Sequence, residues 1–398
     1  MSYELLSDLN VLDDAFNKCK KGVTWKASVQ KFEANKFAHL NKMRKEIENE
    51  TYKQAPFYEF DINERGKKRH IKSLMIYDRV LQRALCDAIL EPTFYKYLIY
   101  DNGASVKGKG VNFARERLKA HLQKYYRKHG SVGYVLLLDF SKFFDSIPHD
   151  KLMVEVAKHI DDNRTLALIN NLVNTFEANG DKNMSLGIGS QISQILGIYY
   201  LTRLDNYVKI VKGIKYYGRY MDDLYVIHHD KKYLKGLLQE MRQIIDDMGL
   251  SINEKKTQIY RIDKGFTYLK IRHVLTDTGY VVRKPCKKNT VRERRKLKAL
   301  KKKKEIPFKD IEESYKSWRG GLSKYNSHKT LYHMDNLFNQ LFKEELRMKN
   351  AKVLSQKEVK DILAEHFGVK PEDVISTKYS YIITESEDSK DGRENIHD

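Results

Sequence analysis

The sequence predicts an α+β fold in which helical and strand-forming regions are largely separate along the chain. Apolar residues recur every three or four positions in residues 1–60, the spacing of amphipathic helices. Residues 134–140, YVLLLDF, are a continuous apolar run around one aspartate, which is typical of a strand buried on both faces. Residues 215–230 read as two strands that meet at a tight turn centred on Met221–Asp222.

The other elements follow in chain order. FYEFDI (57–62) predicts a short strand, and NERGKKRHI (63–71) predicts a charged turn. The next helix should stop before Pro92, because the residue that precedes a proline disfavours helix. Residues 265–284 predict a hairpin, and the chain becomes helical and strongly basic from Asn289 onward.

The charge balance favours a polyanionic partner. The 398 residues include 74 Lys+Arg and 53 Asp+Glu, a formal net charge of +21. Residues 351–398 hold seven Lys/Arg and eleven Asp/Glu, so this segment carries −4 and residues 1–350 carry +25. Such a surplus in a chain rich in tyrosine is typical of nucleic-acid binding. A merely soluble basic protein remains the alternative on composition alone.

Several classes of protein are disfavoured. No window approaches 18 consecutive apolar residues, so we expect no transmembrane helix and no membrane partner. The first residues lack the basic-then-apolar pattern of a signal peptide. The three cysteines lie far apart and predict neither a disulfide framework nor a zinc cluster. These features predict a cytoplasmic protein.

Three aspartates lie among apolar residues, where a charged side chain has no evident structural purpose. Asp139 ends an apolar strand, and Asp222 and Asp223 lie at the predicted turn between apolar residues. Adjacent like charges in such surroundings cost free energy unless cations neutralise them. Carboxylates from neighbouring strands would suit two Mg²⁺ ions, which prefer oxygen ligands. The alternative is a solvated hairpin turn at 222–223 and a helix cap at 139.

At this point the chain resembles reverse transcriptases over roughly residues 30–345. The order and spacing of the motifs carry the resemblance more than any one motif does. In chain order they are a basic fingers motif GKKRHI (66–71), motif A LLLDFSKFFDSI (136–147), motif B LGIGSQISQ (186–194), motif C YMDD (220–223), motif D GLSINEKKTQI (249–259) and motif E GFTYLK (265–270).

The resemblance implies roles for individual residues. Asp139, Asp222 and Asp223 would hold two Mg²⁺ ions, with the Phe140 carbonyl near the metal. Phe144 would be the aromatic gate that excludes the 2′-OH of ribonucleotides, with ordinary core packing as its alternative. Lys256 would be the lysine that protonates pyrophosphate, although Lys255 could fill that place. The remaining implied substrate-binding residues are Lys67 and Arg69 on the triphosphate, Ile188, Gly189 and Gln194 in motif B, and Tyr220 and Met221 beside the primer terminus.

Motif B departs from the common pattern Gln-Gly-x-x-x-Ser-Pro, because Ile188 and Gln194 replace its first and last residues. This form resembles bacterial retroelement enzymes, namely reverse transcriptases of diversity-generating retroelements and of antiphage defence. Replacing a polar residue near the nucleotide sugar with isoleucine predicts low fidelity. The chain shows no HNH-like cluster, which disfavours intron mobility.

The resemblance implies a right-hand polymerase fold. Residues 1–285 would form the fingers and the palm with its antiparallel sheet, 286–348 a basic helical thumb, and 349–398 a small acidic appendage whose last 13 or so residues are disordered. In the thumb, we expect Arg292, Arg294, Arg295 and Lys298 to contact nucleic acid, with a solvated charged face as the alternative.

These expectations describe an RNA-directed DNA polymerase. It would take dNTPs, an RNA template and a DNA or RNA primer, and the resemblance implies a dedicated structured noncoding RNA and possibly a small accessory protein. The alternative is a non-catalytic RNA-binding scaffold with a polymerase fold. Three clustered carboxylates beside a polyanion argue against a scaffold.

Overall fold

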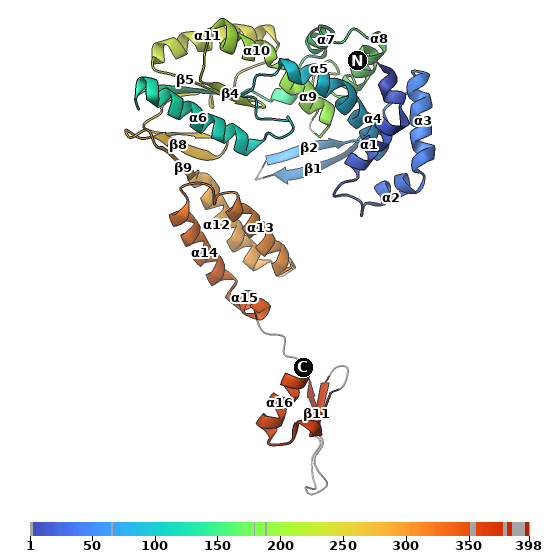
Figure 1. Cartoon of the computed structure of the whole chain (residues 1–398), viewed down its shortest axis with the longest axis vertical. Helices are drawn as coiled ribbons and strands as arrows, with labels where there is room; N and C mark the ends of the chain where they lie inside the picture. Colours follow the sequence, from blue (N-terminus) through green and yellow to red (C-terminus); the bar gives the residue numbers. More distant parts are fainter. Residues whose placement is uncertain are drawn as a thin grey trace. The chain divides into compact units, whose positions relative to one another are not determined.

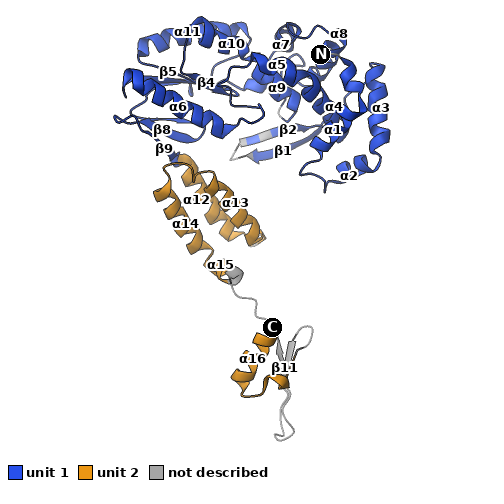
Figure 2. Ribbon diagram, in the orientation of Figure 1, with its two compact units in different colours: residues 1–287 blue, residues 288–398 orange. Residues whose placement is uncertain are grey.

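The chain forms two compact units, Met1–Lys287 and Lys288–Asp398 (Figure 2). The boundary expected from the sequence lay after residue 285. The computed structural model gives only the backbone for residues 64, 67, 69, 348–350, 376, 380–383 and 395–397. It describes residues 3–64, 67–178, 180–187, 189–303, 305–350, 356–376, 380–383 and 395–397.

The first unit begins with helices that pack around a buried apolar face. Leu12 and Phe16 of α1 are fully buried, and Asp8 caps that helix by accepting a hydrogen bond from the Asn10 amide. Helix α1 packs against α4. The helices of this region are η1 (Tyr3–Ser7), α1 (Leu9–Cys19), α2 (Ala27–Ala34), α3 (Lys36–Glu48) and α4 (Ile76–Leu85).

Between α3 and α4 the chain forms a hairpin of β1 (Tyr58–Glu64) and β2 (Lys67–Ser73), shown to the left of α1 and α4 in Figure 1. The prediction that residues 63–71 form a charged turn is therefore wrong for most of the segment. Charges paired across the strands explain the difference: Lys68 Nζ lies 2.8 Å from Asp61, and His70 Nε2 lies 2.9 Å from Glu59.

The helix that was expected to stop before Pro92 continues past it. After α4, a wider π turn at η2 (Cys86–Leu90) leads into α5 (Glu91–Phe94). Pro92 lies in the first turn of α5, where a missing amide hydrogen is tolerated. Next come η3 (Tyr95–Tyr97) and the long helix α6 (Val111–His129).

The central sheet has the strand order β4-β5-β3-β6, and all its neighbouring strands are antiparallel. Strand β3 is buried on both faces, as predicted, because Val135 and Leu136 point to opposite faces and both are fully buried. One face packs against α6 and the other against α11. The strands are β3 (Tyr134–Leu138), β4 (Tyr217–Tyr220), β5 (Asp223–His228) and β6 (Gln258–Arg261).

The rest of the first unit surrounds this sheet. Its helices are η4 (Phe143–Ser146), α7 (His149–Ala157), α8 (Asn163–Val173), α9 (Gln191–Tyr200), α10 (Thr202–Asn206), η5 (Tyr207–Val211) and α11 (Lys231–Asp247). A second antiparallel sheet follows, with β7 (Phe266–Tyr268), β8 (Ile271–Leu275) and β9 (Val281–Pro285). The predicted α+β class is confirmed.

The second unit contains a helical group with its own apolar core of Leu297, Tyr315, Met334 and Phe338. Its helices are α12 (Lys287–Lys302), α13 (Phe308–Gly320), α14 (His328–Leu341) and α15 (Lys343–Asn350). After them come α16 (Gln356–Phe367), η6 (Pro371–Asp373), β10 (Val374–Ser376), β11 (Ser380–Ile383) and β12 (Asn395–His397).

Near the C-terminal end, for which the sequence predicts disorder, the backbone of residues 395–397 pairs with β11. The other residues after 385 lie outside the described part of the chain. Among the described helices, none is long and apolar enough to cross a membrane.

Candidate active site

The register of the central sheet brings the three predicted aspartates together. Leu138, the last residue of β3, pairs with Leu224 of β5, so the residues just beyond that pair lie side by side. Those residues are Asp139 and Asp223. Asp222 precedes Asp223 in the loop that joins β4 to β5. The pairing of β3 with β5 thus brings together aspartates that lie more than 80 residues apart in the sequence.

The β4–β5 loop is tight and conformationally costly. Tyr220 pairs directly with Asp223, which leaves only Met221 and Asp222 to make the reversal. Met221 has a φ of 55°, in the left-handed region that favours glycine. A non-glycine residue in such a conformation costs about 1–3 kcal/mol and persists only where its surroundings hold it. The loop is therefore held in place by neighbouring groups.

A buried ion pair supplies that support. Arg219 and Asp205 are both fully buried and lie 2.6 Å apart. The same guanidinium donates to the Met221 carbonyl at 3.0 Å and to the Ile198 carbonyl at 2.9 Å. Tyr217 donates to the other oxygen of Asp205 at 2.5 Å. Arg219 is thus a positioning residue that ties the aspartate loop to α9 and α10.

Sequence reasoning missed this pair. The available signals were an arginine within an otherwise uncharged strand, Tyr217–Tyr220, and an aspartate within the apolar helical stretch around Asp205. Buried charges of this kind are almost always paired. Nothing in the sequence indicated that the two belong to each other.

The electrostatics of the carboxylates differ from residue to residue. Burial raises the pKa of Asp223 to about 7, and the negative charges of Asp222 and Asp139 add to the shift. Burial, with the nearby Asp139, also raises the pKa of Asp222. A nearby cation would favour the ionised form of both carboxyl groups and so lower these pKa values.

Lys256 lies next to the third aspartate. Its Nζ is 2.7 Å from Asp139 Oδ2, and its side chain is 56% exposed. The hydrogen bond to Asp139 raises the pKa of Lys256 although partial burial opposes the shift. The Asp139 backbone is also fixed, because its carbonyl accepts from the Asn253 amide at 2.8 Å. Lys255, the alternative, is exposed.

The residues present fit a divalent cation by their chemistry. They offer carboxylate oxygens, which hard cations prefer, in a partly buried site with raised carboxyl pKa values. As the side chains stand, no three His, Cys, Asp or Glu groups of the described chain converge as ligands. Release of Asp139 from Lys256 would free an oxygen for that purpose.

Two phenylalanines of motif A, Phe140 and Phe144, differ in burial and in packing. Phe140 is buried, and its ring packs 5.5 Å from that of Phe143. Phe144 is half-buried and packs over Gly197 of α9, where an added Cβ would come within 3.1 Å of the Phe144 ring. Any larger residue at 197 would displace this ring. The ring of Phe144, the proposed gate, thus packs directly on the backbone of α9, because Gly197 has no side chain.

The motif B segment is described except for Ile188, which lies outside the described residues. Gly189 has a φ of 121°, so its backbone conformation favours glycine, although an added Cβ would make only ordinary contact with the Lys72 carbonyl at 3.4 Å. Gln194 is exposed and accepts a hydrogen bond from Ser105 at 3.0 Å. Tyr220 and Met221 are half-buried next to the aspartates in the chain.

Lys67 and Arg69 belong to strand β2 by their backbone, where Arg69 pairs with Ile62. Their side chains lie outside the described part of the structure. Their expected contact with a triphosphate therefore stays a prediction.

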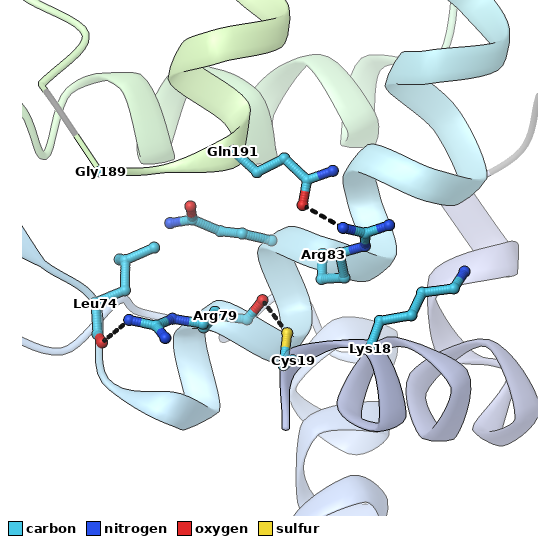
Figure 3. Close-up of a pocket in the computed structure, with 8 residues that line it drawn as sticks. Lys18, Cys19, Leu74, Arg79, Arg83, Gly189 and Gln191 are labelled. Carbon is cyan, nitrogen blue, oxygen red and sulfur yellow. Dashed lines mark hydrogen bonds between the residues drawn. The ribbon is translucent and has the colours of Figure 1, made fainter. Parts of the chain in front are cut away.

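A basic pocket adjoins motif B and was not anticipated (Figure 3). Its volume is about 330 Å³. Arg83 of α4 reaches across it to Gln191 at 3.1 Å and pairs with Asp87 at 2.8 Å. Arg79 donates to two uncharged oxygens, those of Ser73 and Leu74. The residues that line the pocket are Lys18, Cys19, Leu74, Arg79, Gln82, Arg83, Gly189 and Gln191.

The cationic residues expected in the thumb all lie on α12 of the second unit. That helix buries Glu293 and Leu297 and leaves the cations outside. Among them, Arg292 donates a hydrogen bond to the Asn289 side chain at 3.0 Å. The exposed cations are Arg292, Arg294, Arg295 and Lys298.

The fold and the carboxylate geometry define a polymerase palm, and comparison with known proteins identifies its family. Residues 53–273 match the sequence family described as reverse transcriptase (RNA-dependent DNA polymerase). The match covers more than half of the chain. The chain therefore belongs to the reverse transcriptase family.

The chain is similar to a curated protein and to a solved structure. The chain is 28% identical over 216 residues to the COX1/OXI3 intron 2 protein of Saccharomyces cerevisiae, a match that covers 52% of this chain and 24% of that protein. The chain thus spans about a quarter of the length of this curated relative. A solved structure of apo telomerase from Candida tropicalis, truncated from its C-terminal domain, matches 57% of this chain and 56% of its own at 15% identity and a TM-score of 0.45.

Proposed function

We propose that this protein is an RNA-directed DNA polymerase that extends a primer along an RNA template. The observation that carries the proposal is the β3–β5 register, which sets Asp139 beside Asp222 and Asp223. The reaction joins the primer 3′ oxygen to the α-phosphorus of a dNTP and breaks the bond from that phosphorus to the pyrophosphate oxygen. The family membership supports this reaction.

The three aspartates would hold two divalent cations, and Mg²⁺ suits a set of oxygen ligands. Bound there, the cations would supply activation of the primer hydroxyl and neutralisation of charge on the leaving pyrophosphate. Lys256 is protonated at neutral pH and would give its proton to the pyrophosphate. Its ion pair with Asp139 keeps the ammonium group within reach of the site.

Further residues would define the nucleotide site. The half-buried ring of Phe144 would lie beneath the sugar and exclude a 2′-OH, and the Phe140 backbone would border the metal. Tyr220 and Met221 would support the primer terminus, and Gly189 would allow close approach of the base pair. Lys67 and Arg69 would bind the triphosphate, for which forked and point-charge donors are suited.

The cationic surfaces would bind the nucleic acid. The pocket beside motif B presents Lys18, Arg79 and Arg83, and one carboxylate, Asp87, pairs with two of them. We assign this pocket to a backbone phosphate of the template strand. The exposed cations of α12 would contact phosphates of the template–primer duplex without reading its sequence.

The finer role follows from the sequence of motif B. Ile188 and Gln194 support an enzyme of the bacterial retroelement type that copies a dedicated structured noncoding RNA with low fidelity. Targeted diversification would involve a small accessory protein and a template/variable repeat pair near the gene. Phage defence would involve the RNA alone.

Primer extension tests the proposal. The purified full chain is given Mg²⁺ and dNTPs, with the same primer on an RNA or a DNA template. We expect synthesis on RNA and misincorporation above that of a high-fidelity polymerase. Binding of the RNA without synthesis, even with flanking noncoding RNA supplied, would favour the scaffold. Accurate copying would overturn the low-fidelity proposal alone.

A further inference from the structure

Five aromatic rings stack in a row at the end of β5 that is remote from the aspartates. Tyr125 and His129 of α6 stack at 4.9 Å, and His129 stacks on His229 at 5.0 Å. His228 lies 4.3 Å from His229 and stacks on Tyr233 of α11 at 4.2 Å. We call this row the ring ladder. It runs from the fully buried Tyr125 to Tyr233, which is 36% exposed.

The ring ladder lines a cavity of about 320 Å³, within the range of small-ligand sites. Three lysines border the same cavity. Lys212 pairs with Glu240 at 2.6 Å. Lys128 and Lys215 are exposed, and neither has a carboxylate partner among the residues that the structure describes. The cavity is therefore lined by aromatic rings and by two lysines without a carboxylate partner among the described residues.

Two histidines of the ladder, His129 and His228, present uncharged rings at neutral pH. Burial lowers the pKa of His228, and the adjacent His229 adds to this effect. Burial and the neighbouring His229 and Lys128 likewise lower the pKa of His129. The rings do not form a metal site, because no three such groups in the described chain converge as ligands.

The ladder is separate from the carboxylates. Strand β5 starts at Asp223 and ends at His228, so the two sites lie about 17 Å apart along the strand. The residues of the ladder and its lysines belong to none of the motifs that define the family resemblance. A function for them must therefore differ from the polymerase reaction itself.

We propose that the ring ladder and its lysines form a second nucleic-acid site, which binds single-stranded RNA by base stacking and phosphate contact. Aromatic rings accept any base on their faces, and nearby cations follow the backbone. The site would anchor a single-stranded segment of the template RNA away from the active site. The proposal depends on RNA as the partner but not on catalysis.

Photo-cross-linking locates the bound RNA directly. The full chain is mixed with a 4-thiouridine-substituted single-stranded RNA, irradiated and digested, and cross-linked peptides are identified by mass spectrometry. We expect a cross-link in the segment from His228 to Tyr233, which excludes the aspartate loop at residues 220–223. Tyr233→Ala should reduce it about fivefold or more, whereas Tyr233→Phe, which keeps the ring, should preserve it. Absence of a cross-link in this segment would overturn the proposal.

Salt dependence tests the phosphate contacts. In Lys128→Glu/Lys215→Glu, the slope of log affinity for single-stranded RNA against log salt should fall by about 1.4, because each lost contact removes roughly 0.7. The control Lys31→Glu/Lys45→Glu changes two exposed lysines of α2 and α3 by the same charge and should leave the slope nearly unchanged. Equal slopes in the two variants would contradict the proposal.

Two further outcomes are decisive. If lysine reversal weakens binding but Tyr233→Ala does not, the surface binds polyanions such as an acidic peptide, and base stacking is refuted. Extension of a short primed template should be unchanged in the ladder variants. If the wild type makes no product on that template, the proposed polymerase activity is refuted. The cross-link still tests whether the ring ladder binds RNA.

Discussion

Asp223 shows how a proposed catalytic role and folding stability conflict at a single residue. An aspartate has a pKa of about 3.9 in an unfolded chain, whereas burial raises that of folded Asp223 to about 7. The folded state therefore holds this proton more tightly than the unfolded state does. Folding stability from this group is lost as the pH rises from about 4 to about 7, and it stays lost above that.

Asp223→Asn should consequently stabilise the protein when metal is removed. In EDTA, we expect the free energy of unfolding to rise by roughly 2 kcal/mol at pH 8 and by clearly less at pH 5. Denaturant unfolding at the two pH values measures the difference. A gain that does not depend on pH would show that Asp223 is not the group that titrates.

Phe144 should set the choice of sugar. Phe144→Ala removes the half-buried ring above Gly197, so incorporation of ribonucleotides relative to deoxyribonucleotides should increase about tenfold or more. Single-nucleotide extension with matched dNTP and NTP measures the ratio, with Phe144→Tyr as the control that keeps the bulk. An unchanged ratio would assign Phe144 to core packing alone.

Much of the site could be predicted at the level of residues, because Asp139, Asp222 and Asp223 violate the apolar patterns around them. Arg219 and Asp205 could not be predicted as a pair, since their contact arises only when β4 lies against α10. The pocket with Lys18 and Arg79 was missed for a similar reason, because α1, α4 and the start of α9 build it together.

At the scale of elements, the β4–β5 hairpin is held by the buried ion pair of Arg219 and Asp205. A core built only of apolar side chains would contain no such pair. Removing one partner of such a pair leaves an uncompensated charge, whereas replacing both with apolar side chains is often tolerated. This difference allows the structural role of Arg219 to be separated from its positioning role.

Arg219→Met should lower the free energy of unfolding by about 3–5 kcal/mol, and the double variant Arg219→Met/Asp205→Leu should recover most of that loss. Primer extension should stay at least roughly tenfold below wild type in the double variant, because the Met221 carbonyl has lost its donor. Full activity in a stable double variant would refute the positioning role.

Strands and helices differed in how well the sequence predicted them. Strand β3 and the β4–β5 hairpin followed from apolar runs that only a buried sheet explains. Strand β2 was missed, because its lysines and histidine read as a turn until Asp61 and Glu59 of β1 are seen opposite them. The helix through Pro92 was missed, because the π turn η2 places Pro92 in the first turn of α5, where a missing amide hydrogen is tolerated.

At the scale of the whole molecule, one dense group of positive charges lies on a single helix, α12, which we propose contacts nucleic acid. The second unit presents α12 with exposed cations on the side away from its buried Leu297. If these cations contact phosphates, the number of contacts determines how steeply the affinity for nucleic acid falls with salt. It does not determine which nucleotide sequence is preferred.

Arg294→Glu/Arg295→Glu/Lys298→Glu should reduce the slope of log affinity for an RNA–DNA duplex against log salt by about 2–3. The control Lys309→Glu/Lys324→Glu/Lys329→Glu changes three exposed lysines of the same unit and should alter the slope little. Filter binding over a salt series measures both variants. Matching slopes would mean that α12 is only a solvated face.

The central claim is that the carboxylates brought together by β3 and β5 catalyse DNA synthesis on RNA. Its most direct test is the rate of dNTP incorporation on a primed RNA template by Asp222→Asn/Asp223→Asn, which keeps shape and removes charge. We predict that the rate falls by about a thousandfold or more while binding of the primed template is retained. Synthesis by this variant at a rate near that of the wild type would contradict the account.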